Sequence, residues 1–136
     1  MKHVIAVLVR LALLGLALTA YTQLVVPLMS SAGDADIGAG LIAFAALVVV
    51  GFVGCLVDTL RHGAVTAVVW WLAIAVCLAV GWWVALAVPQ DTSSSFGELL
   101  AADAELLPFT IGLVAFPAGV GAVIGHAVSR RTRRQE

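Results

Sequence analysis

Charged residues are scarce in this sequence, and the places where they are missing are informative. Only 11% of the 136 residues are Asp, Glu, Lys or Arg, whereas an ordinary soluble domain has about 25%. Hydrophobic residues make up 62%, and the mean hydropathy is +1.12. A chain so poor in polar groups cannot cover its apolar surface in water. The composition therefore predicts an integral membrane protein without a soluble domain, because no polar segment is long enough to bury a core of its own.

Cysteine and catalytic groupings are scarce as well. The two cysteines, Cys55 and Cys77, form no CxxC motif, and the helices predicted here separate them by roughly 15 Å in depth. A disulfide requires Cα atoms about 6 Å apart, so we interpret both residues as unpaired, buried apolar side chains. No set of nucleophile, base and orienting group is recognisable. We therefore expect no enzymatic activity, no cofactor and no metal ion.

Four long apolar runs account for most of the chain. They cover residues 4–26, 37–57, 64–88 and 108–128. Each has about 20 residues or more, which at ~1.5 Å per residue crosses a hydrocarbon core of ~30 Å. The first run follows the basic Lys2 and His3 and contains a cleavage-like sequence at 17–20, as a secretory signal does. We interpret it as an uncleaved span, because it continues to Val26 and contains Arg10. The sequence thus predicts an all-α fold, in which residues 1–136 form one domain of four transmembrane helices.

Short polar segments join these runs. Asp58-Thr59-Leu60-Arg61-His62-Gly63 lies between the second and the third, and we interpret it as a polar turn. We expect Pro27 to end the first helix, because proline lacks the backbone donor that continues a helix. Residues 96–107 repeat apolar positions at helical spacing, which predicts a short helix in the membrane interface before the last span. The alternative is a plain extension of that span.

The charges that are present separate by side. With four spans, all seven basic residues fall at one end of the bundle: Lys2, Arg10, Arg61, Arg130, Arg131, Arg133 and Arg134. Of the eight acidic residues, all but Asp58 and Glu136 fall at the other end. Cytoplasmic loops carry the excess of basic residues in membrane proteins. We therefore expect a multi-pass protein of the cell (plasma) membrane with both termini in the cytoplasm and residues 129–136 as a basic tail.

Glycines and tryptophans predict how the helices pack. Gly121 and Gly125 form a GxxxG pattern in the fourth run, which lets two helix backbones approach closely. Two tryptophan pairs occur in the third run, at 70–71 and 82–83. Tryptophan gathers at membrane–water interfaces, so we expect one member of each pair to face lipid and the other to face a neighbouring helix.

One polar cluster is a candidate functional site. Arg10 in the first run, Asp58 at the end of the second and His126 near the end of the fourth should lie at a similar depth. Asp58 sits at the negative end of a helix dipole and needs a cation, which Arg10 or Arg61 can supply. Ionisable groups inside a membrane often serve function, here as a proton relay or the inner mouth of a substrate path. The competing interpretation is an ion pair that clamps helix ends.

Asp58 and His62 could also bind a metal, but no third ligand lies nearby.

Packing signals outnumber buried polar groups in this sequence. We therefore expect a non-catalytic accessory or assembly subunit that packs against a larger membrane partner. A small homo-oligomeric transporter or channel is the alternative, and it requires a water-filled path beside the polar cluster. The expected partners are the lipid bilayer and either a larger membrane complex or further copies of this chain. No nucleic acid is expected.

Overall fold

The computed structural model describes residues 2–29, 37–86, 88 and 95–133. In this part of the chain every regular element is helical, and four helices are long and apolar enough to cross a membrane. These candidate spans are Val4–Leu28, Gly38–His62, Ala64–Ala85 and Leu106–Arg131. The prediction of an all-α chain with four potential spans is confirmed.

The first span changes its helical pitch near its end. It consists of α1 (Lys2–Ala20), the π-helical turn η1 (Tyr21–Val25) and α2 (Val26–Met29). The prediction that Pro27 ends the helix is wrong, because α2 continues through it. A proline ring clashes with the carbonyl four residues earlier in a regular α-helix. The wider turn that precedes Pro27, in which the Val26 amide donates to the Tyr21 carbonyl, opens space at that point.

The second and third spans are joined by a single glycine. Helix α3 (Ile37–His62) and helix α4 (Ala64–Leu86) flank Gly63, which has a φ of +88°. The predicted six-residue polar turn is therefore wrong in extent, since five of its residues form the last turns of α3. Arg61 and His62 lie in the final turn, where positive charge suits the helix dipole. Glycine alone adopts this left-handed conformation without strain, so one residue reverses the chain.

The predicted helix over 96–107 is shorter than expected and separate from the last span. Helix α5 (Phe96–Ala102) is capped at its N-terminus by Ser95, which forms a capping box with Glu98. These hydrogen bonds hold the pKa of Glu98 below its usual value, so the contribution of the cap is lost as the pH falls through that lowered pKa. A turn over 103–105 leads into helix α6 (Leu106–Arg133), which extends beyond the predicted bounds of 108–128 at both ends.

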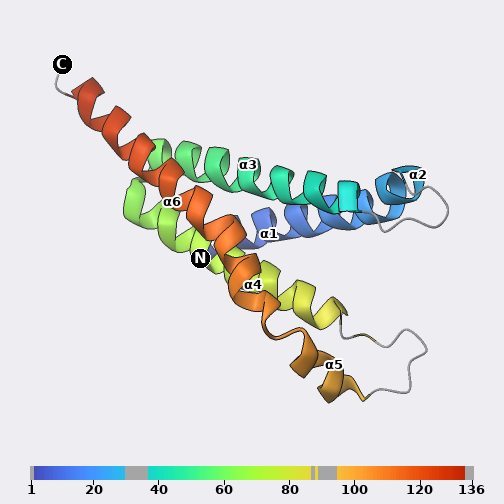
Figure 1. The fold of residues 1–136 in the computed structure, drawn as a ribbon. Helices are drawn as coiled ribbons and strands as arrows, with labels where there is room; N and C mark the ends of the chain where they lie inside the picture. The colour runs from blue at the N-terminus through green and yellow to red at the C-terminus, as the bar shows by residue number, and fades with distance from the viewer. Residues whose placement is uncertain (1, 30–36, 87, 89–94, 134–136) are drawn as a thin grey trace.

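Helices α3, α4 and α6 form the packed part of the molecule, with α3 packed chiefly against α6 (Figure 1). The GxxxG prediction is confirmed at this contact. A Cβ atom on Gly121 would overlap the Phe52 carbonyl oxygen, and one on Gly125 would lie 2.9 Å from Thr59 Cγ2. The core around them includes Ile74 and Val114. The two backbones approach because these positions carry no side chain.

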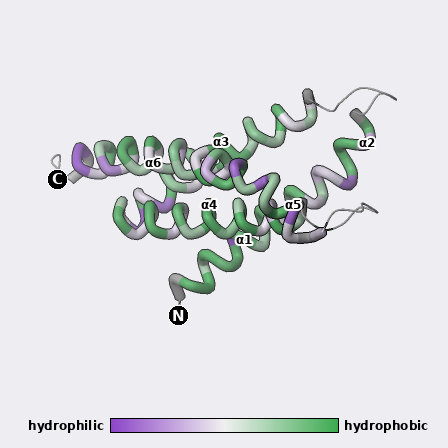
Figure 2. Tube along the Cα trace, turned by 60° about the horizontal axis from the view of Figure 1, so that its bottom comes forward, coloured by the Kyte–Doolittle hydropathy of each residue, from purple (hydrophilic) through white to green (hydrophobic). Residues whose placement is uncertain are grey.

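Helix α1 lies at the edge of this core. No described side chain between residues 4 and 28 is buried, although Val7, Leu11 and Leu14 contact the core. In Figures 1 and 2, α2 and the start of α3 diverge from the end of α4 and from α5. Figure 2 also shows hydrophobic residues along the long helices and hydrophilic ones at the end of α6 and around α5. We call the end with Arg61 and Arg130 the basic end, and the opposite end, with α5, the acidic end.

The two cysteines lie in different environments. Both are free thiols, as predicted. Cys55 is fully buried in the core, whereas Cys77 is exposed on α4, so the expectation that both are buried is wrong for Cys77. The difference arises because Cys77 faces α1, which does not pack closely enough to cover it.

Candidate functional site

The structure brings two of the three predicted site residues into direct contact. Arg10 on α1 donates from Nη2 to Asp58 Oδ1 on α3 over 2.5 Å, and its Nη1 donates to the Ala6 carbonyl over 3.1 Å. The Asp58 side chain is only 5% exposed, whereas that of Arg10 is 28% exposed. Of the two predicted partners of Asp58, Arg10 and Arg61, the structure shows Arg10. This contact joins α1 to the core.

Two tryptophans complete this ion pair. Trp71 Nε1 donates to Asp58 Oδ2 over 2.9 Å, so each carboxylate oxygen has a donor. The Arg10 guanidinium carbon lies 5.2 Å from the centre of the Trp70 ring, within the range of a cation–π contact. Both Trp70 and Trp71 are buried. The expectation that one of this pair faces lipid is therefore wrong, because both rings serve the ion pair.

A glycine makes the tryptophan contact geometrically accessible. Gly54 lies one helical turn before Asp58 on α3, and a Cβ atom there would lie only 2.0 Å from Cζ2 of the Trp71 ring. The missing side chain leaves room for the indole close to α3, from where its N–H reaches the carboxylate. The glycine four residues before Asp58 was visible in the sequence, but the aromatic partner on α4 was not evident from it.

His126, the third predicted residue, lies elsewhere at the basic end. It lines a pocket of about 580 Å³ between the end of α3, the start of α4 and the last turns of α6, together with Arg61, His62 and Arg130. We call this the basic pocket. His62 links the two places, since its Nδ1 lies 4.0 Å from Asp58 Oδ1 and its ring centre lies 5.0 Å from that of Trp70. Within the described residues, no group of three or more His, Cys, Asp or Glu side chains is arranged to hold a metal ion.

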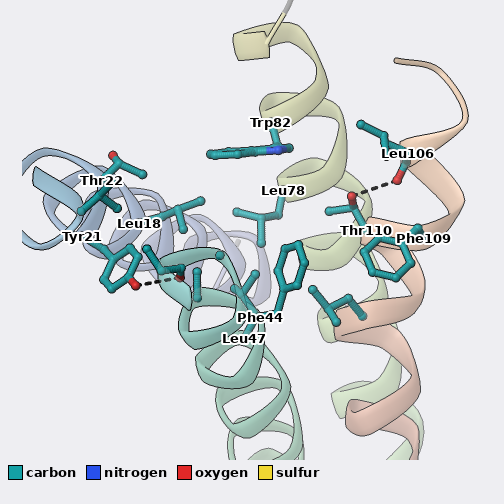
Figure 3. Close-up of a pocket in the computed structure, with 15 residues that line it drawn as sticks. Leu18, Tyr21, Thr22, Phe44, Leu47, Leu78, Trp82, Leu106, Phe109 and Thr110 are labelled. Carbon is teal, nitrogen blue, oxygen red and sulfur yellow. Dashed lines mark hydrogen bonds between the residues drawn. The ribbon is translucent and has the colours of Figure 1, made fainter. Parts of the chain in front are cut away.

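An apolar cavity opens at the other end of the bundle. It has a volume of about 280 Å³ and lies where α1, α3, α4 and α6 diverge (Figure 3). Leu18, Phe44, Leu78, Trp82 and Phe109 are among the residues that line it.

The few hydroxyl groups in its wall are already hydrogen-bonded to backbone carbonyls. Tyr21 donates to Ala39 over 2.7 Å, and Thr110 donates to Leu106 over 2.9 Å (Figure 3). The cavity therefore offers a ligand little besides apolar surface.

A groove follows the side of α1 that faces α4. Its volume is about 440 Å³. Small residues line it at intervals of four: Gly15 and Thr19 on α1, and Cys77, Gly81 and Ala85 on α4. A Cβ atom on Gly15 or Gly81 would meet no other atom within 4 Å. We call this the α1–α4 groove.

The arrangement around Asp58 is better suited to holding helices together than to moving protons. Both oxygens of the carboxylate are occupied, and the cation is fixed by three separate contacts. Removing one partner of a charge pair in a low-dielectric interior strongly destabilises the folded protein, because the other charge is left without a partner. The ion pair can therefore fix the position of α1, which few apolar contacts hold.

Comparisons of this chain with protein-family models, with curated proteins and with solved structures give no match.

Proposed function

We propose that this protein is a non-catalytic accessory or assembly subunit that packs against a larger membrane protein through α1 and α4. The observation that carries the proposal is the incomplete packing of α1. The first candidate span has no buried side chain between residues 4 and 28, yet an ion pair from the half-buried Arg10 to the buried Asp58 fixes its position. Open space remains on both of its flanks, towards α4 in the α1–α4 groove and towards α3 beside Val50 and Val53.

The occupant that best fits the α1–α4 groove is a transmembrane helix of another protein. Small residues four apart on both walls allow a helix backbone to approach closely. The hydroxyl groups of Thr19 and Thr22 donate to carbonyls of their own helix over 2.9 Å. The threonine hydroxyls of the groove are therefore not free for a ligand, and the rest of its lining, which includes Leu11, Leu18 and Leu78, is largely apolar and suits an apolar helix.

A substitution that fills the groove tests the proposal. Gly81→Leu places a side chain into open space, so the isolated protein should keep its fold while the partner helix is displaced. Gly119→Leu, which also meets no atom within 4 Å and does not line this groove, is the matched control. In complexes solubilised from native membranes, we expect Gly81→Leu to lower the associated fraction about tenfold and Gly119→Leu to leave it unchanged. A tenfold loss corresponds to about 1.4 kcal/mol.

Photocrosslinking identifies the occupant. A benzophenone side chain at position 81 should capture the same protein that Gly81→Leu releases, whereas one at Val123, which is 70% exposed on α6, should not. If Gly81→Leu leaves a native complex intact, or if the protein is a lone monomer in mild detergent, the proposal fails. An adduct between two copies of the chain would assign the groove to self-association instead.

A small homo-oligomeric transporter or channel is the second candidate, and the apolar cavity is the observation that favours it. The space between the helices of a bundle is a common place for a small-molecule site. Between this cavity and the basic pocket, the core at Ile74, Ala75 and Val114 is closed. The candidate therefore requires a second conformation in which the core opens, and we expect spin-label distances across α3 and α4 to reveal two populations if it holds.

A further inference from the structure

The basic pocket carries the positive charge of two arginines, with which no acidic side chain among the described residues pairs. Two arginines and two histidines line it, and none of its lining residues is acidic. The one carboxylate at this end of the described chain is Asp58, which is buried and already bound by Arg10 and Trp71. Arg61 and Arg130 are exposed and make no ion pair with any described residue.

Three separate segments converge to build the pocket. On α6, His126 and Arg130 are four residues apart and share one face. At the end of α3, Arg61 and His62 follow on from the ion pair, and His62 is held against the Trp70 ring. The basic side chains are thus placed by two helices packed together through their glycines, and by the contacts of His62.

Backbone groups of two helix ends also line the pocket. The end of α3 contributes carbonyls at the negative end of its dipole, whereas the start of α4 contributes amides. Gly63 turns the chain so that Ala64 and Val65, the first residues of α4, also line the pocket. The first amides of a helix have no acceptor within it and carry the positive end of the helix dipole. The Ser129 hydroxyl, by contrast, donates to the Gly125 carbonyl over 2.9 Å and is not free for a ligand.

A compact anion with several acceptor oxygens matches this arrangement of donors. Arginine side chains and helix N-termini together bind phosphate in many proteins. The pocket lies where three spans end, which is the level of lipid headgroups in a bilayer. We propose that the basic pocket binds a phosphate group, carried either by the headgroup of an anionic membrane lipid or by a small phosphorylated solute.

Neighbouring arginines provide a matched pair for the test. Arg130 lines the pocket, whereas Arg131, the next residue, is exposed and does not. The full chain, held in phosphatidylcholine nanodiscs, is titrated with dioleoylphosphatidylglycerol, and separately with glycerol 3-phosphate, and binding is measured by native mass spectrometry. We expect Arg130→Gln to weaken binding about fivefold and Arg131→Gln to weaken it less than twofold. Arg61→Gln should match Arg130→Gln.

The two titrations distinguish the sources of the phosphate. Binding of the lipid alone assigns the pocket to a headgroup, and binding of glycerol 3-phosphate at similar concentration assigns it to a solute. Equal losses in Arg130→Gln and Arg131→Gln would overturn the proposal, since they would indicate diffuse attraction to the basic end. It is also overturned if neither ligand binds. Unchanged helicity by circular dichroism confirms that the variants are folded, which we expect because all three arginines are exposed.

Discussion

At the scale of single residues, the Arg10–Asp58 pair accounts for how an outlying helix is held. Apolar contacts alone give α1 little preference for the protein over lipid, because lipid chains are as apolar as its leucines. A charge pair does favour the protein over lipid as the surroundings of α1, because moving either charge alone into hydrocarbon costs much free energy. Tyr21, whose hydroxyl donates to Ala39, provides a second attachment near the acidic end.

Removing one partner of this pair should destabilise the protein. Arg10→Met leaves Asp58 with only the Trp71 N–H and the more distant His62, and we expect a loss of about 3 kcal/mol in the free energy of unfolding. Unfolding in mixed micelles measures it. Arg131→Met, on an exposed residue without an ion pair among the described residues, should change stability by less than 0.5 kcal/mol, as surface substitutions usually do.

A double variant tests whether the Arg10–Asp58 pair holds helices together or serves as a catalytic or transport group. Arg10→Met combined with Asp58→Leu removes both charges, so it should recover most of the lost stability if the pair acts by holding helices. A double variant as unstable as Arg10→Met alone would contradict this explanation.

At the scale of helices, glycine positions determine which faces meet. Gly51, Gly121 and Gly125 all lie at the α3–α6 contact, where added Cβ atoms would touch backbone or side-chain atoms of the other helix. Gly15, Gly81 and Gly119 would meet nothing. Glycine therefore occurs both at the closely packed α3–α6 contact and on helix surfaces that no other part of the described chain covers.

An alanine pair on α6 measures this difference. Gly121→Ala forces a methyl group against the Phe52 carbonyl and the Leu56 amide, which are backbone atoms of α3 and cannot move independently. We expect a loss of about 1–3 kcal/mol in the free energy of unfolding. Gly119→Ala, two residues away, should instead gain up to about 1 kcal/mol from helix propensity. Equal effects in the two variants would mean that the close α3–α6 approach does not stabilise the fold.

At the scale of the whole molecule, the charges lie at two ends. Arg61, Arg130 and Arg131 lie at the basic end, and Glu98 and Glu105 lie near the acidic end. The two ends of the bundle therefore carry opposite charge, even though the net charge of the chain is only −1. By the preference of basic loops for the cytoplasm, we propose that the basic end faces the cell interior.

Accessibility of introduced cysteines tests this orientation. In a chain whose two natural cysteines are replaced by alanine, Glu105→Cys should react with a membrane-impermeant maleimide added to intact cells. Arg131→Cys should react only after the membrane is permeabilised. The reverse pattern would place the basic end outside, and the proposed phosphate pocket would then face the outer leaflet.

The sequence by itself determined the class of fold. Apolar runs of about 20 residues form helices in a membrane, because lipid offers no partner for free backbone groups. For that reason the number of potential spans, the helical character of residues 96–102 and the GxxxG contact could all be predicted. The ends of the helices were harder to predict from the sequence, because a segment such as 58–62 suits the last turn of a helix as well as a loop.

Only the tertiary structure decided what the polar residues do. Arg10 and Asp58 were recognisable as a pair, but Trp71 and the position of His126 depended on the rotation of each helix about its axis. That rotation is a property of the packed bundle, because hydrophobicity on all sides of a membrane helix leaves no periodic signal to fix it. The basic pocket and the space beside α1 likewise exist only where several helices meet.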